Sequence, residues 1–172
     1  YLDHLRRYDD AVRDSLDAGA PAFRTLRSGR TVYGGGGIRP DIVIEPDTAG
    51  YSDYYAGLIR RGVVTDFVND WLDRSRDSLA RLYPAFETFD EGFEPPDELL
   101  GALTQRGTQR GVVFDKAGFA ASQEIMRTQL KALAAQRLFG TGAYFQVVNP
   151  RIASAYKRAV EILSDWERQG KP

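Results

Sequence analysis

The segment FRTLRSGRTVYGGGGIRPDIVIEPD, residues 23–47, holds the most informative pattern in this chain. It begins as an extended stretch, turns at Ser28-Gly29, and continues through four consecutive glycines into a β-branched run. Glycine suits a backbone that must take positive φ or pass close to another chain, and four glycines in a row are costly to order. We therefore predict a hairpin around Ser28-Gly29 and a third short strand over residues 41–44.

The order of residues in this segment is similar to that of a segment in a known protein family. Residues 29–41, GRTVYGGGGIRPD, resemble the segment that closes the catalytic domain of the carboxy-terminal processing (tail-specific) serine peptidases. The resemblance is closest to the longer bacterial type with a helical tail, and it continues through residues 86–93, 130–134 and 143–146. The residues that carry the structural motif are Gly29, Arg30, Gly34, Gly35, Gly36, Gly37, Ile38, Pro40 and Asp41.

This resemblance implies an organisation in three parts. Residues 1–22 would be the helical end of an insertion, residues 23–47 the last strands of the peptidase core, and residues 48–172 a helical C-terminal domain. Since the chain begins with Tyr1 and not with Met, we expect it to be part of a longer protein. The resemblance also implies that the parent enzyme cleaves exported proteins near their C-termini with a serine and a lysine, in the bacterial periplasm or cell envelope.

The partners implied by the resemblance are the remainder of the parent peptidase and the protein substrates of that enzyme. Self-association through the helical part is a further expectation. The chain itself would be non-catalytic, because the serine and the lysine of the family do not stand at matching positions in it.

Hydrophobic periodicity predicts that the fold is mainly α, a helical bundle with a small β element (a hairpin plus a short strand) near its N-terminal side. Ser52 and Asp115 are candidate N-caps, Pro84 ends a helix, and Asn149-Pro150 is a start signal for the last helix. Apolar residues recur at helical spacing in segments 2–17, 52–61, 63–83, 96 to 107 or 111, 115–139, and from 149 onward.

Three phenylalanines, Phe86, Phe89 and Phe93, follow one another at helical spacing. Proteins that stack nucleic-acid bases combine aromatic residues with basic grooves, whereas acidic residues surround this group. We therefore predict that the three side chains anchor a core.

Composition places the chain among ordinary globular proteins. The 172 residues are 42% hydrophobic and 27% charged, and the formal net charge is −1. That balance gives no electrostatic attraction to nucleic acid, and no apolar run is long enough for membrane insertion. The absence of cysteine excludes disulfides, thiolate nucleophiles and cysteine-ligated zinc.

The glycine run does not have the features of a phosphate-binding loop. Such a loop needs Gly-Lys-Ser/Thr and a following helix, but Ile38-Arg39-Pro40 and an extended stretch follow here. Asp41, Glu45 and Asp47 would alternate onto one side of a strand and could hold a hard cation, but Pro46 interrupts the run. The simpler interpretation is that Arg30 and Asp41 tie the turn and the strand together.

Two short segments echo the catalytic elements of the peptidase family. Residues 121–125, ASQEI, resemble the stretch that holds the nucleophile, and Gly140-Thr141-Gly142 resembles the loop that supplies the lysine base. Threonine cannot deprotonate a serine, and both segments follow the glycine motif although the family places them before it. We interpret Ser122 as a helix-surface serine and predict no catalytic residue, no cofactor and no metal. The lone histidine, His4, lies in a charged segment and does not complete a triad.

The function predicted from the sequence is that of a non-catalytic C-terminal domain of a processing serine endopeptidase. One alternative is a stand-alone helical module that binds a protein segment in an apolar groove, which a large exposed apolar patch would favour. A second alternative is an autonomous hydrolase that uses Ser122 or Asp41.

Overall fold

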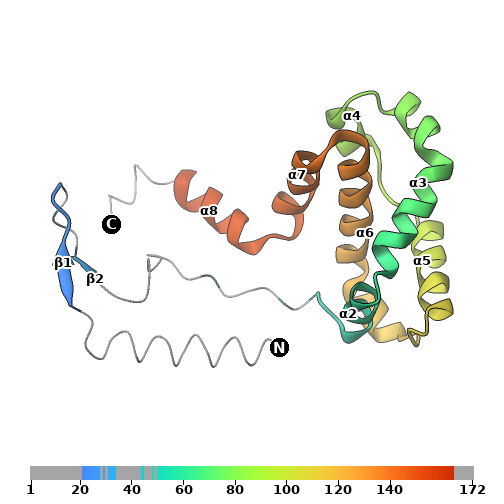
Figure 1. Cartoon of the computed structure of the whole chain (residues 1–172), viewed down its shortest axis with the longest axis horizontal. Coiled ribbons are helices and arrows are strands. Elements are labelled where there is room, and N and C mark those ends of the chain that lie inside the picture. The colour runs from blue at the N-terminus through green and yellow to red at the C-terminus, as the bar shows by residue number, and fades with distance from the viewer. Residues whose placement is uncertain are drawn as a thin grey trace. The chain divides into compact units, whose positions relative to one another are not determined.

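The computed structural model describes residues 21–27, 29, 31–33, 44, 48 and 50–164. Contacts divide the chain into two compact units, Tyr1–Val43 and Ile44–Pro172. Among the described residues, the β element lies in the first unit and the helices lie in the second (Figure 1).

The β element is a two-stranded antiparallel hairpin, as the sequence predicts. Strand β1 (Ala22–Arg24) pairs with β2 (Thr31–Tyr33), with Phe23 opposite Val32. Gly29 has φ +64, and its N–H donates to Thr25 O over 3.0 Å, so the turn uses the left-handed conformation that glycine adopts without strain. The helix predicted over 2–17 and residues 41–43 of the predicted third strand lie outside the described residues.

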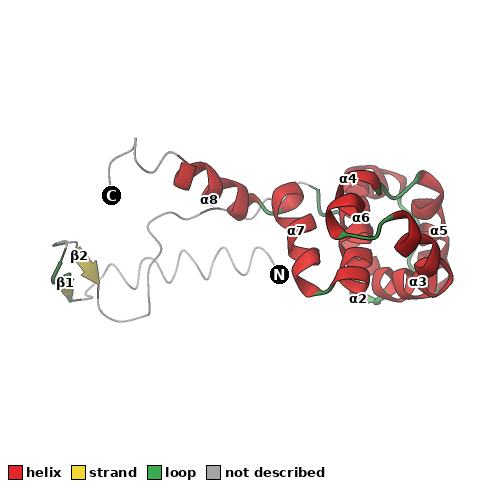
Figure 2. Cartoon of the chain, turned by 90° about the horizontal axis from the view of Figure 1, so that it is seen from above, coloured by secondary structure: helices red, strands yellow, loops and turns green. Residues whose placement is uncertain are grey.

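The second unit is helical, which confirms a mainly α fold with a small β element near its N-terminal side (Figure 2). Its helices in the described residues are α2 (Asp53–Arg60), α3 (Val63–Leu82), α4 (Phe86–Gly92), α5 (Asp97–Gln109), α6 (Lys116–Phe139), α7 (Thr141–Ile152) and α8 (Ser154–Ser164).

Local capping signals determine where several helices begin. The Ser52 hydroxyl accepts from the Tyr55 N–H at the start of α2, and the Asp115 carboxylate accepts from the Ala117 N–H at the start of α6. These contacts satisfy backbone donors that have no partner within the helix. Both N-caps were predicted from the sequence and are confirmed.

The start predicted for the last helix at Asn149-Pro150 is wrong. Both residues lie inside α7, which begins at Thr141, and α8 begins only at Ser154. Ala143 and Val147 of α7 are buried in the core. Packing of this face therefore carries the helix through the local Asn-Pro signal, although Pro150 has no N–H to donate to the carbonyl of Gln146.

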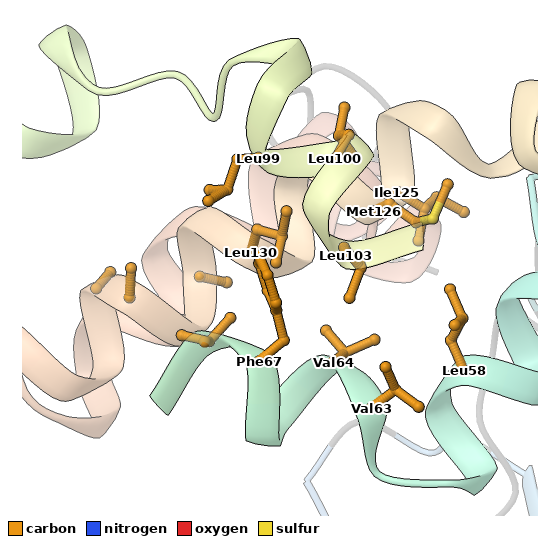
Figure 3. Packing of buried hydrophobic residues seen from close by; sticks show 14 of the residues in the cluster. Leu58, Val63, Val64, Phe67, Leu99, Leu100, Leu103, Ile125, Met126 and Leu130 are labelled. Carbon is orange, nitrogen blue, oxygen red and sulfur yellow. The ribbon is translucent and has the colours of Figure 1, made fainter. Parts of the chain in front are cut away.

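Helix α6 is the central element of the helical unit, with α2, α3, α4 and α7 packed against it. Figure 3 shows side chains of α2, α3, α5 and α6 converging, among them Leu58, Leu103 and Leu130, whose exposed fractions are 1% or less. Full burial of such a side chain contributes about 1.5–3 kcal/mol. Among the described residues, no helix combines the length and apolar character needed to cross a membrane.

The three phenylalanines anchor this core, as predicted. Phe89 and Phe93 are buried and stack with ring centroids 4.9 Å apart, and Phe86 is half-buried. Leu82, which belongs to the predicted helical segment 63–83, is 69% exposed in the last turn of α3.

Candidate functional site

Of the nine residues that carry the structural motif, the structure describes only Gly29, which lies in the hairpin turn. Arg30, Gly34–Gly37, Ile38, Pro40 and Asp41 lie outside the described residues. His4 and the other two carboxylates considered as cation ligands, Glu45 and Asp47, also lie outside the described residues. In the part of the chain that the structure describes, no group of acidic or histidine side chains could hold a metal ion.

Ser122 is not the surface serine predicted from the sequence, because it is fully buried on α6. Its Oγ accepts from the Ser52 N–H over 2.9 Å and donates to the Ser52 Oγ over 2.8 Å. Ser52 Oγ in turn accepts from the Tyr55 N–H over 3.1 Å. The hydroxyl of Ser122 thus anchors the N-terminal cap of α2, 70 residues earlier in the chain.

This arrangement gives Ser122 a structural role. A serine nucleophile needs a neighbouring base and access for a substrate. The hydrogen-bond partners described for Ser122 are the backbone and hydroxyl of another serine, neither of which can act as a base at neutral pH. Thr141, which stands where the related loop carries lysine, is exposed at the start of α7.

Lys131 is a buried cation that the sequence interpretation did not single out. It lies on α6 with 1% of its surface exposed. Its Nζ donates to the Asp90 carbonyl and to Glu94 Oε1, each over 2.7 Å. Arg151 of α7 joins the group, with Nη2 2.8 Å from Asp90 Oδ1. The network therefore links α6, α7 and the region of α4.

Lys131 and Ser122 do not form a serine–lysine pair. They are nine residues apart on one helix, a rise of about 13.5 Å at 1.5 Å per residue. The ammonium is also engaged by oxygens of Asp90 and Glu94. A lone lysine in the apolar run Leu130–Ala134 was the sequence signal that could have indicated a buried lysine at this position.

Two buried tyrosines line the inner face of α2. Burial raises the pKa of Tyr55 far above its ordinary value, and the nearby phenols of Tyr51 and Tyr144 raise it further. Burial also raises the pKa of Tyr54, whose hydroxyl has no hydrogen-bond partner among the described residues. Both phenols therefore stay protonated near neutral pH and are poor candidates for a general base.

A shallow cavity of ≈ 250 Å³ lies between α3 and α5. Asp70 and Arg106 form an ion pair in its lining. The lining residues are Phe67, Asp70, Arg74, Ala102, Gln105, Arg106 and Gln109. The lining contains no histidine, serine or lysine that would support hydrolysis, and its carboxylate, Asp70, is paired with Arg106.

Helix α8 presents an exposed apolar surface. Tyr156, Val160 and Leu163 are 46, 45 and 68% exposed, and no residue of the helix is buried. This surface is the feature of the described helices that most resembles an interaction site.

Comparison with known proteins gives a family for the helical unit. No curated protein and no solved structure matches the chain. A family model described as a family of unknown function (DUF8443) matches residues 54–140, which is half of the chain. The match begins at the second residue of α2 and ends just after α6. This protein therefore belongs to DUF8443, a family of unknown function.

Proposed function

We propose that the chain is the non-catalytic C-terminal part of a processing serine endopeptidase that cleaves exported proteins near their C-termini. The observation that carries this proposal is the motif of residues 29–41, GRTVYGGGGIRPD, with its resemblance to the segment that closes the catalytic domain of these peptidases. A location in the bacterial periplasm or cell envelope belongs to the same proposal.

Two features of the structure support it. The described hairpin has strands of three residues each, and a two-stranded sheet of this size is marginal by itself. Such strands are expected at the edge of a larger sheet contributed by the rest of a peptidase core. In the helical unit, Ser122 and Lys131 are both used in structural contacts, so catalysis would depend on residues of that core.

The test compares this chain with the whole protein that its gene encodes. The reading frame upstream of Tyr1 should encode a peptidase core with its serine and lysine. The whole protein should cleave an unstructured substrate with a free C-terminal tail, and the 172-residue chain should not. A gene that encodes no peptidase core would contradict the proposal.

A second candidate function is a helical protein-binding module, which the exposed apolar face of α8 favours. A module of this kind should act without any peptidase core. Binding of a protein segment, measured with the 172-residue chain alone, therefore separates the two candidate functions.

A further inference from the structure

The cavity between α3 and α5 lies next to a regular series of ion pairs. The two helices pack against each other (Figure 1). Asp66 of α3 pairs with Arg110 of α5 over 3.2 Å. Four residues further along α3, Asp70 pairs with Arg106, which lies four residues earlier on α5. The two helices are therefore antiparallel, and an acid of α3 meets an arginine of α5 at each successive turn.

At the next turn the described residues form no such pair. The same spacing of four brings Arg74 of α3 opposite Ala102 of α5, and both residues line the cavity of ≈ 250 Å³. An arginine thus replaces the acid of α3, and an alanine replaces the arginine of α5. Because the alanine side chain is short, the space beside Arg74 stays open.

The guanidinium of Arg74 is accessible to a ligand. The residue is exposed, and its side chain forms no hydrogen bond or ion pair with another described residue. Asp77, three residues further along α3, does not pair with it in the described structure. A guanidinium carries five N–H donors in one plane and stays charged, so water or an anion must satisfy it here.

The charges of the lining favour a ligand with a single negative charge. Arg74 and Arg106 contribute two positive charges and Asp70 contributes one negative charge, so the lining has a net charge of +1. A monoanion neutralises this excess. A dianion such as hydrogen phosphate would leave a negative charge close to the Asp70 carboxylate, which repels it.

The remaining lining residues favour a small anion with an apolar part. Phe67 and Ala102 provide apolar surface beside Arg74. A carboxylate is planar and can accept two parallel hydrogen bonds from one guanidinium. Ligand pockets usually have volumes of about 300–1,000 Å³, so a cavity of ≈ 250 Å³ suits a molecule of few atoms.

We propose that this cavity binds small monocarboxylates that carry a short apolar chain. The carboxylate pairs with Arg74, and the chain lies against Phe67 and Ala102. Because the cavity is shallow and the ligand is small, binding is weak, in the millimolar range. The proposal does not depend on the peptidase assignment, because it concerns only α3 and α5.

Titration of the isotope-labelled 172-residue chain with butanoate, followed by amide chemical shifts, tests the proposal. Saturable shifts of the lining residues should appear below about 50 mM butanoate. Butanamide has the same shape without the charge and should give no saturable shifts. Inorganic phosphate at equal ionic strength should bind more weakly than butanoate. The absence of saturable shifts with butanoate, equal binding of butanamide, or tighter binding of phosphate would overturn the proposal.

A pair of arginine variants tests the role of the guanidinium. Arg74→Gln should raise the dissociation constant of butanoate at least about fivefold, because the carboxylate loses its charged donor. Arg76→Gln is the matched control, since Arg76 is exposed on the same helix, lies outside the lining and carries the same charge. It should leave the dissociation constant unchanged. Equal effects of the two variants would reflect net charge alone and would overturn the proposal.

A pair of alanine variants tests the cavity without changing any charge. Ala102 is exposed, so Ala102→Leu should leave the fold intact while it fills the space beside Arg74, and saturable shifts should be lost. Ala80→Leu, at an exposed alanine of α3 outside the lining, should bind butanoate as the wild type does. Circular dichroism should show the same helix content in all variants. Butanoate binding that is retained in Ala102→Leu would overturn the proposal.

Discussion

Helices α6 and α8 carry the same kind of apolar periodicity but meet different surroundings. On α6, Met126 and Leu130 are almost completely buried, because α2, α3, α4 and α7 surround the helix. On α8, Tyr156 and Leu163 are exposed, and α7 is the main neighbour. The pattern predicts a helix and its apolar face, whereas the extent of burial is set by elements distant in the sequence.

The largest expected effect comes from truncating a core leucine of α6. Leu130→Ala should lower the free energy of unfolding by about 2–5 kcal/mol, since it removes buried methyl groups and leaves a cavity. The matched change Leu163→Ala on α8 should cost less than about 0.5 kcal/mol, because that side chain is 68% exposed. Urea unfolding measures the free energy of unfolding of both variants. Similar losses in Leu130→Ala and Leu163→Ala would contradict the difference in burial between α6 and α8.

The next largest effect concerns the charged network around Lys131. Asp90→Asn should cost about 2 kcal/mol, because the Asp90 carboxylate lies 2.8 Å from Arg151 Nη2 and 3.7 Å from Lys131 Nζ, and both cations lose that negative charge while Glu94 still accepts from the lysine. A double-mutant cycle with Lys131→Met measures the coupling between the two residues. The network as described predicts a coupling above about 0.5 kcal/mol. Additive effects would mean that the Asp90 carboxylate does not interact with Lys131, whose bond to the Asp90 backbone carbonyl is kept in Asp90→Asn.

Removal of the Ser122 hydroxyl tests how α6 positions α2. Ser122→Ala should cost about 1–2 kcal/mol, because the Ser52 N–H loses its buried acceptor. Ser164→Ala on α8 is the matched control, since the hydrogen bond described for that hydroxyl is to the Val160 carbonyl of its own exposed helix. Its cost should stay within about 0.5 kcal/mol in the same unfolding measurement. A Ser122→Ala protein as stable as wild type would contradict the anchoring role.

The smallest effect concerns alkaline pH. The pKa of Tyr55 is raised in the folded protein, so the folded state holds this proton more strongly than the unfolded chain does. Its contribution to stability is therefore complete below the unfolded pKa of about 10 and is lost as pH rises above that value. Tyr55→Phe should make the fall in unfolding free energy between about pH 9 and 11 shallower. Tyr156→Phe on α8 is the matched variant. If Tyr55→Phe left the slope of unfolding free energy against pH unchanged, that result would contradict a Tyr55 pKa raised by burial.

Local signals predict much of the fold. The hairpin turn at Gly29 and the caps at Ser52 and Asp115 depend on residues close in the sequence, and all three are confirmed. The Asn149-Pro150 signal fails because burial of Ala143 and Val147 outweighs it. Local chemistry therefore identifies helix ends only where tertiary packing does not oppose it.

The contacts of the candidate site could not be predicted in the same way. The partner of Ser122 is 70 residues away, and a partner of Lys131 is 41 residues away. A single serine or lysine on a helix does not indicate which distant element will cover it. The lysine within an apolar run was a usable signal for burial, but it does not identify Asp90 and Glu94 as the partners.

The proposal that the chain is non-catalytic and that Ser122 has a structural role is tested most directly by labelling of the purified 172-residue chain with a serine-reactive fluorophosphonate. Ser122→Ala is the matched variant, and an active serine peptidase is the positive control. We predict no labelling of the wild-type chain beyond the level of the variant, because the hydroxyl is buried against Ser52 and lacks a base. Stoichiometric labelling that is lost in Ser122→Ala would contradict the account.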